Sequence, residues 1–401
     1  MRRRLVVPSS GHPCRMTREV RSHGDVFGRP EEVRGLRGSW TAARDGALFY
    51  CPDYRDFISS RPGRDADRHV VAVAEGTGGA VLFMPFTRDS HPHVFNLGER
   101  RLGRIAAKTL RLGNPWLTDA HDPQTIADLL GRVLARERAD LIDLGDVREG
   151  SSLRAALDLL PFPVLPLRLG RKEGVRWLID LPACFDDYLH GFPRKERRNL
   201  SWKLRRVRKE FDMEVRVVSR PEDVEPFLRE GERISRMTYQ WGVGQRLCND
   251  RPTREWFVHL AEQGRLRCHL LLLDGVPCAF SRGVISGGIY LDDTPGFDPQ
   301  FARYSVGTVL MLHVLMDLIA NTSCRVFDFG TGGDWAGYKA RFGTRAIPCN
   351  AYYVLNGLRP RALSILSGER LLSAVKNAGA TLLRDEATRM RIKRRLRRYG
   401  A

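Results

Sequence analysis

The chain of 401 residues lacks the cysteine patterns that hold metal ions or disulfide scaffolds. Its eight cysteines form no CxxC pair and show no Cys/His spacing of the zinc-binding kind. Most stand beside apolar residues, as in the segment CHLLLL that begins at Cys268. Such cysteines are typical of buried positions in a reduced, cytosolic protein. We therefore expect no bound metal and a cytoplasmic location.

Long hydrophobic runs are also absent. A helix needs about 20 apolar residues to span a bilayer, and the longest run here, Val309 to Ala320, is interrupted by His313 and Asp317. This run predicts a buried helix. The first residues, MRRRLVVPSSGHPCR, are basic but lack the apolar stretch of a signal peptide. Neither a spanning helix nor a secretory signal is expected.

Several catalytic motifs are missing as well. The sequence contains no GxSxG elbow, no Walker A motif and no HExxH motif. These absences argue against a serine hydrolase, a P-loop NTPase and a zinc metalloprotease.

Acidic residues are outnumbered. The 66 Lys and Arg residues exceed the 47 Asp and Glu residues, and the formal net charge is +19. An excess of this size favours anionic partners such as nucleic acid, nucleotide-linked substrates or a membrane surface. A genome of high GC content, which encodes Arg freely, is the other explanation, and charge alone does not separate the two.

The length and a hydrophobic content of 42% predict two or three domains with real cores. Residues 1–38 are rich in Arg, Gly and Pro and predict a flexible basic arm. We expect a first domain at 39–180 and a second at 181–358. Residues 359–401 predict a basic helical tail.

One order of elements occurs twice. The first half contains a hairpin, then a helix over 123–138, then the strand LIDLG from Leu141. The second half contains a hairpin over 268–285, then a helix over 308–320, then the strand VFDFG from Val326. Each of these strands places an Asp between apolar neighbours just before a Gly. We infer two copies of one α/β unit with mixed sheets, joined by helices.

The segment after residue 289 predicts an anion site. A strand over 289–293 is followed by a turn and then by the sequence YSVGT, which opens the apolar helix. Free N–H groups and the positive end of the helix dipole suit a phosphate or pyrophosphate. The candidate donor-binding residues are Arg303, Ser305, Val306, Gly307 and Thr308. The alternative is that they only cap and turn the chain.

Three segments carry a resemblance to a known family. They are FDDYL from Phe185 with RKERRNL from Arg194, then GFDPQFARYSVGT from Gly296, and FDFG from Phe327 with YKARFG from Tyr338. In order and spacing they resemble the GNAT acyltransferase superfamily over about residues 180–350. Within it they are similar to the CelD/BcsL-like acetyltransferases, which are related to the FemAB aminoacyl ligases.

The resemblance implies a tandem GNAT-like fold with two acyltransferase-like halves. It also implies a bacterial N-acyltransferase that moves an acyl group from acetyl-CoA or another acyl-CoA to an amine of a small or sugar-linked acceptor, as in exopolysaccharide or cell-envelope biosynthesis. In the Fem branch the donor is aminoacyl-tRNA and the acceptor is a peptidoglycan precursor.

Acyl transfer needs a general base near the amine. Asp292 and Asp293 end the strand that would face the acceptor, and because neighbouring strand residues point to opposite faces, only one of them is expected to serve. Asp328 stands between two Phe residues, where a carboxylate needs a partner or a raised pKa. It is a second candidate base, although its counterpart Asp143 favours a structural role.

Four further side chains complete the candidate site. Tyr304 could protonate the leaving group or simply pack. Lys339 follows a Gly-rich loop, and the Fem ligases have a comparable lysine near substrate phosphate; the alternative is a solvated lysine. Tyr338 and Trp241 are candidate acceptor contacts, although aromatic residues at such spacing also build cores.

Two other functions remain open. A Fem-type ligase would hold tRNA on the basic helix at 194–209. A non-catalytic protein would dock nucleic acid or an anionic membrane surface through that helix and through residues 389–398, whose alternative is a solvated helix.

Overall fold

The computed structural model describes residues 25–27, 69–75, 81–89, 92–97, 100–112, 122–166, 174–238, 241, 246–332 and 337–382. Most of the predicted basic arm, and all of residues 389–398, lie outside the described residues. The described chain divides into two compact units. Unit 1 contains the described residues up to 174 and from 348 onward, and unit 2 contains residues 175–347.

The sheet of unit 1 has the strand order β1-β2-β3-β6-β7-β15, with β8 also paired to β15. Only β6 and β7 run parallel among these neighbours. Its strands are β1 (Asp25–Phe27), β2 (His69–Glu75), β3 (Val81–Asp89), β6 (Thr109–Leu112), β7 (Leu141–Arg148), β8 (Val164–Pro166) and β15 (Arg345–Leu355). A separate hairpin comprises β4 (His93–Leu97) and β5 (Arg100–Ile105).

The helices of unit 1 cover both faces of its sheet. They are α3 (Pro123–Glu137), α4 (Ser152–Leu159) and α11 (Pro360–Leu382). Helix α3 forms because Ile126, Leu130 and Val133 recur at helical spacing and are fully buried in one core. Alternation along β7 sends Ile142 into that core and Leu141 into a second core under α11.

The sheet of unit 2 has the order β9-β14-β13-β12-β11-β10. Here only β13 and β14 run parallel. Its strands are β9 (Gly174–Asp180), β10 (Met213–Val218), β11 (Cys268–Leu273), β12 (Val276–Ser286), β13 (Ile289–Phe297) and β14 (Val326–Gly332). Its helices are α5 (Phe185–His190), α6 (Arg194–Glu210), α7 (Pro221–Arg236), α8 (Arg251–Glu262), η5 (Pro299–Tyr304), α9 (Val306–Asn321) and α10 (Gly337–Phe342).

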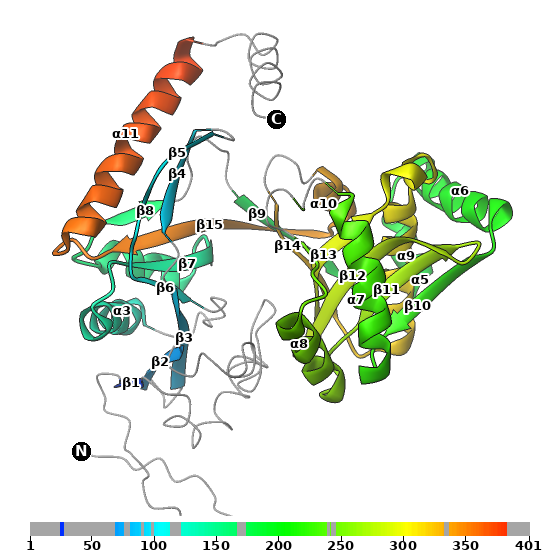
Figure 1. The fold of residues 1–401 in the computed structure, drawn as a ribbon, viewed down its shortest axis with the longest axis horizontal. Helices are drawn as coiled ribbons and strands as arrows, with labels where there is room; N and C mark the ends of the chain where they lie inside the picture. The colour runs from blue at the N-terminus through cyan, green and yellow to red at the C-terminus, as the bar shows by residue number, and fades with distance from the viewer. Residues whose placement is uncertain are drawn as a thin grey trace, which may run out of the picture. The chain divides into compact units, whose positions relative to one another are not determined.

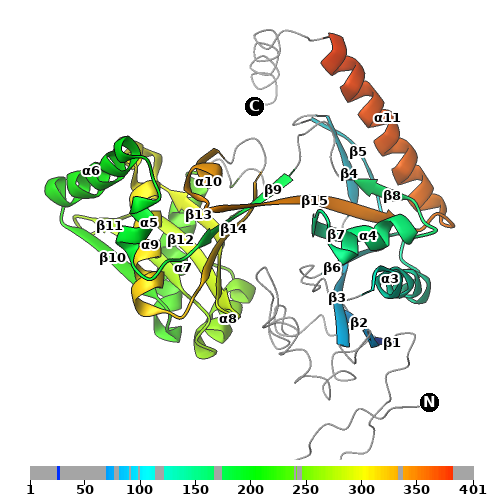
Figure 2. The same cartoon turned by 180° about the vertical axis from the view of Figure 1, so that it is seen from behind.

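Two helical layers cover the sheet of unit 2 (Figure 1 and Figure 2). Helices α5, α6 and α9 share one core with the sheet, and α7 and α8 share the other. The prediction of an α/β fold with mixed sheets is thus confirmed. The repeated order is also present: β6-α3-β7 in unit 1 and β13-α9-β14 in unit 2 are both parallel strand pairs joined by a helix.

Candidate active site

Strands β13 and β14 diverge after a short parallel pairing. They pair only at residues 289–291 and 326–328, whereas β13 continues to Phe297 and β14 to Gly332. Beyond that point each strand keeps its other neighbour, β12 or β9. The facing main-chain edges are therefore not paired with each other. In open α/β sheets, ligands bind at the carboxyl ends of parallel strands, which is where this divergence lies.

A β-bulge in β13 lies at the same place. Gly283 pairs with Asp292 and Arg282 pairs with Thr294, so Asp293 is the extra residue. Bulges re-aim side chains and are common beside active sites. Asp292 is buried, whereas Asp293 is exposed and forms an ion pair with Arg282. Of the two candidate bases, Asp292 is the enclosed one.

The carboxylate of Asp292 is held on one side only. Ser281 Oγ donates a hydrogen bond of 2.7 Å to Asp292 Oδ1, and Ser281 Oγ also lies 3.2 Å from the hydroxyl of Tyr290. Oδ2 has no hydrogen-bond partner among the described residues. Because a buried carboxylate is poorly solvated, the pKa of Asp292 rises to about 6; the Ser281 hydrogen bond and the charge of Lys339 oppose this rise. The group can therefore exchange a proton near neutral pH.

Tyr290 takes its position because residue 283 is a glycine. A Cβ atom at Gly283 would lie 2.0 Å from the Tyr290 hydroxyl oxygen. Tyr290 is fully buried, and burial raises its pKa well above the ordinary value. It therefore stays a neutral donor or acceptor to Ser281. The sequence prediction missed both residues, although an isolated glycine inside a strand signals close approach.

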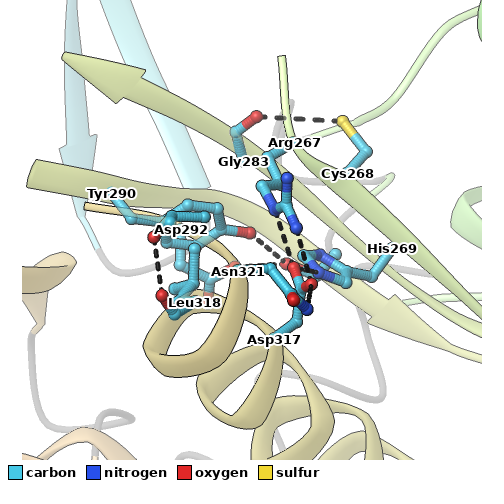
Figure 3. Close-up of polar contacts among 11 residues, drawn as sticks. Arg267, Cys268, His269, Gly283, Tyr290, Asp292, Asp317, Leu318 and Asn321 are labelled. Carbon is cyan, nitrogen blue, oxygen red and sulfur yellow. Dashed lines mark hydrogen bonds and ion pairs between the residues drawn. The ribbon is translucent and has the colours of Figure 1, made fainter. Parts of the chain in front are cut away.

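Helix α9 is fixed to the sheet by a largely buried polar cluster, in which His269 is fully buried and Arg267 and Asp317 are partly exposed (Figure 3). Asp317 on α9 accepts hydrogen bonds from Arg267 at 2.6 and 2.7 Å and lies 2.9 Å from Nε2 of His269 on β11. Burial alone would raise the pKa of Asp317, but the bonds from His269, Arg267 and Asn321 outweigh it and hold that pKa well below its usual range. The cluster keeps the helix in register with β11.

The first amides of α9 are free. Ser305 is the N-cap in a left-handed conformation, with φ 56° and ψ 39°, and its side chain makes no capping bond. Its own N–H donates to the carbonyl of Ala302 at 2.9 Å, so Ser305 is not an available donor. The N–H groups of Val306, Gly307 and Thr308 have no acceptor within the described chain. Three of the four predicted amides therefore remain available to an anion.

The equivalent helix of unit 1 begins differently. Its N-cap is Asp122, whose carboxylate accepts from Thr125 N at 3.1 Å, and Pro123 follows at the first position and has no N–H. A carboxylate thus already satisfies the N-terminus of α3. Of the two helix N-termini, that of α9 is the one without a side-chain cap in the described chain.

Asp328 is locked in a buried ion pair. Arg176 Nε lies 3.0 Å from both of its oxygens, and the amide of Gly330 donates to Oδ1 at 2.7 Å. The side chain is completely buried. Asp143 repeats this bond in unit 1, where it accepts from Gly145 N at 3.0 Å. The arrangement favours the structural role that this repetition predicted, because both oxygens of Asp328 are occupied.

Tyr304 and Arg303 lie just before α9. The Tyr304 ring packs edge-on against Phe211 at 4.8 Å, and Arg206 and Arg303 lie over it at 5.0 and 4.8 Å. These contacts favour the packing alternative for Tyr304. Arg303 is exposed and has no carboxylate partner among the described residues.

Lys339 is not a solvated side chain. Its Nζ donates to the carbonyl of Phe329 at 2.5 Å, beyond the point where β13 and β14 part, and its charge acts on Asp292. Tyr338 is 43% exposed, and its ring meets Phe329 edge-on. Both residues thus lie against the diverging part of β14.

Trp241 lies in a different setting. Its ring contacts are with Arg236 and Arg246, at 4.7 and 5.5 Å. No hydrogen bond or ring contact in the described chain joins Trp241 to the residues around Asp292.

Two kinds of feature are absent from the described residues. No group of three His, Cys, Asp or Glu residues there could hold a metal ion, and no helix there is long and apolar enough to cross a membrane.

Comparison with known families finds a match that covers most of unit 2. Residues 194–340 match the family model of the acetyltransferase (GNAT) domain. This stretch is therefore a GNAT acetyltransferase-like domain, which runs from α6 into α10 and includes Asp292 and the start of α9. At this level the expectation of an acyltransferase-type enzyme is confirmed. No curated protein matches the chain significantly.

Several solved structures are distantly similar. The C-terminal domain of a putative lysylphosphatidylglycerol synthetase from Agrobacterium fabrum is 14% identical, with a TM-score of 0.47, and the match covers 82% of this chain and 96% of that one. FemX is 13% identical, with a TM-score of 0.47 and coverages of 75% and 94%. A tandem GNAT protein from the clavulanic acid biosynthesis pathway is 13% identical, with a TM-score of 0.46 and coverages of 82% and 97%. Likenesses this remote carry no argument about the function of this chain.

Proposed function

We propose that unit 2 catalyses N-acyl transfer from an acyl-CoA, acetyl-CoA first among them, to the amine of a small or sugar-linked acceptor. The observation that carries the proposal is the carboxylate of Asp292. It is enclosed at a bulge where two parallel strands part, it has one oxygen without a partner among the described residues, and its pKa is raised to about 6. These are the properties of a general base that works at neutral pH.

The start of α9 supports the donor half of the proposal. The amides of Val306, Gly307 and Thr308 would accept the pyrophosphate of CoA, with Arg303 as an exposed cation beside them. Gly307 also leaves little room for a side chain, because a Cβ atom there would lie 3.3 Å from the ring of Phe297. A side chain at this position would therefore have to displace the Phe297 ring.

The reaction requires a neutral amine at the thioester carbonyl. The amine nitrogen forms the new C–N bond, Asp292 takes the proton that the amine releases, and the C–S bond breaks. The CoA thiolate leaves and takes up a proton from solvent, and Asp292 releases its proton to solvent before the next turnover. Main-chain N–H groups at the bulge and along the unpaired edge of β13 would polarise the carbonyl. The charge of Lys339, which opposes the rise in the Asp292 pKa, keeps the carboxylate ionised at pH 7.

The test is calorimetry of the full-length protein with acetyl-CoA, longer acyl-CoAs and CoA, followed by turnover with a panel of amines. We expect donor binding by the wild type, and in the Asp292→Asn variant unchanged binding with turnover lost. Absence of binding by every CoA species would remove the donor assignment. Full turnover in Asp292→Asn would remove the assignment of the base.

Membership of the CelD/BcsL-like branch, and an acceptor from exopolysaccharide or cell-envelope biosynthesis, belong to the same proposal. Their support is the set of three sequence segments and the GNAT match over residues 194–340. Turnover with amino sugars or sugar nucleotides but not with lysine peptides would sustain this acceptor class, and the opposite preference would overturn it.

A Fem-type ligase is the second candidate, and α6 favours it. The helix carries nine basic and two acidic residues, and Arg206 alone pairs with a carboxylate among those basic side chains in the described chain. Trp202 is 50% exposed between them, and Arg206 also donates to the carbonyl of Arg303. A basic row with an aromatic side chain, beside the proposed phosphate site, suits an RNA acceptor end.

Salt dependence separates the two donors. Binding of tRNA through several phosphates should weaken steeply with salt, whereas acyl-CoA binding should change little. An exchange of Arg194 and Arg198 for Glu should abolish tRNA binding and leave acetyl-CoA binding intact. Binding of RNA without any transfer from aminoacyl-tRNA or acyl-CoA would instead support the non-catalytic alternative.

A further inference from the structure

Exposed apolar side chains gather on and beside α11. Twelve large hydrophobic residues are exposed among the described residues, and a third of them lie between positions 358 and 375. They are Leu358 at 89%, Leu363 at 46%, Leu371 at 68% and Val375 at 49%. Exposed apolar residues that cluster in this way mark an interaction site more often than isolated ones do.

Leu358 lies just before α11, and the other three residues lie on the helix. At about 3.6 residues per turn, Leu371 and Val375 lie about 80° and 120° round the helix axis from Leu363, so the three share one broad side of α11. The opposite face packs on unit 1 through Ala362, Ile365 and Leu372, and Glu369 lies 2.8 Å from His93 of β4. Since the inner face is already anchored, the outer apolar face is available to a partner. Figure 1 and Figure 2 show α11 along the margin of unit 1.

The basic sequence that follows α11 favours an anionic partner. Residues 389–398 read RMRIKRRLRR, with seven basic residues and no acidic one. Clustered Lys and Arg residues are attracted to an anionic lipid surface, and the attraction grows with their number. Stable membrane attachment takes two signals, and an apolar helix face beside a polybasic segment supplies both.

We propose that the outer face of α11 docks on an anionic membrane surface, whose charge is complementary to the basic sequence of residues 389–398. A second copy of the chain is disfavoured because two proteins of net charge +19 repel each other. Nucleic acid explains the basic segment but not a face made of Leu and Val, since bases stack on aromatic side chains. A lipid surface alone uses both the charge and the aliphatic face. This surface lies on unit 1 and is independent of the chemistry proposed for unit 2.

The test is co-sedimentation of the full-length protein with vesicles of phosphatidylcholine, with and without phosphatidylglycerol. We expect binding only to the anionic vesicles. Leu371→Glu combined with Val375→Glu should weaken it by roughly tenfold or more, the scale of two lost aliphatic burials. Val276→Glu is the matched control, because Val276 is 48% exposed but lies in unit 2. Arg394→Glu with Arg395→Glu should also abolish binding.

Three outcomes would overturn the docking surface. The wild type fails to sediment with anionic vesicles, or the α11 variant binds as well as Val276→Glu does. In the third, sedimentation velocity without lipid shows a dimer that Leu371→Glu and Val375→Glu dissociate. Circular dichroism melting of each variant verifies the fold. Acetyl-CoA binding in the α11 variant should equal that of the wild type.

Discussion

Ser281 Oγ donates to Asp292 Oδ1 at 2.7 Å, and within the described chain this is the one hydrogen bond that the Asp292 carboxylate receives. Asp292 is only 8% exposed. An enclosed carboxylate with a single donor is poorly compensated for its lost hydration, which explains the raised pKa. The same pair thus fixes the direction of the side chain and leaves its second oxygen for chemistry.

Asp292→Asn should remove the base while keeping the bond from Ser281. We expect kcat to fall by about 10²–10⁴, the usual contribution of general base catalysis, with unchanged donor affinity. In the wild type the rate should rise with pH through about 6, because only the ionised carboxylate accepts a proton. The measurement is kcat against pH for both proteins. A wild-type profile that is flat between pH 5 and 8 would contradict the assignment.

The same substitution should stabilise the fold. The pKa of Asp292 is raised from 3.8 to about 6 in the folded protein, so at pH 7 folding is opposed by the cost of ionising the buried group. That cost is on the order of 3 kcal/mol. It is absent below pH 3.8, the pKa of Asp292 in the unfolded chain, and it is complete once the pH has risen through about 6, the pKa in the folded protein. Asn carries no such cost. Urea unfolding should show a stabilised variant at pH 7 and equal stabilities near pH 4.

Lys339→Ala should shift the pH profile toward higher pH. The positive charge of Lys339 lowers the pKa of Asp292, so its removal leaves burial less opposed. Lys339→Arg, which keeps the charge, should restore the position of the profile. A merely structural lysine, needed only for its bond to Phe329, would change stability and leave the pH profile in place. An anion contact with the substrate would instead raise KM.

Gly307→Asp should abolish donor binding by placing an anion at the free amides of α9. Gly307→Asn is the matched variant, because it has nearly the same size and no charge. Both must displace the Phe297 ring, which a Cβ atom would approach to 3.3 Å. We expect calorimetry to show residual acetyl-CoA binding by the Gly307→Asn variant and none by the Gly307→Asp variant. Gly103→Asp, at an open position of unit 1, should bind as the wild type does. Equal binding by all three would place the phosphate elsewhere.

The repeated local pattern made much of the fold predictable. Apolar spacing located α3 and α9, and the Asp-x-Gly sequence marked β7 and β14, because these features depend on neighbours in the chain. Asp292 and Lys339 were found as candidate residues for the same reason: each follows a strand or loop signal.

The remaining features depend on distant partners. Arg176 is 152 residues from Asp328, and nothing near Arg176 in the sequence names that carboxylate. The bulge at Asp293 results from the register of β12, which the sequence of β13 alone does not contain. The Ser305 amide is unavailable because of η5, since the carbonyl of Ala302 in that short helix accepts its hydrogen bond.

Arg176→Met should destabilise unit 2 strongly, and unit 1 offers the control. Arg176 and Asp328 are 5% and 0% exposed, so the substitution leaves a buried carboxylate unpaired at a cost of about 3–5 kcal/mol. In unit 1 the counterpart of Asp328, Asp143, lies 3.3 Å from Arg111, which is 58% exposed, so Arg111→Met should cost less than about 1 kcal/mol. Arg176→Met combined with Asp328→Leu should recover most of the loss, since no charge then remains without a partner. Urea denaturation of the three variants measures these differences. Equal, small effects in both single variants would mean that water reaches Asp328 and that the ion pair is not a main source of the stability of unit 2.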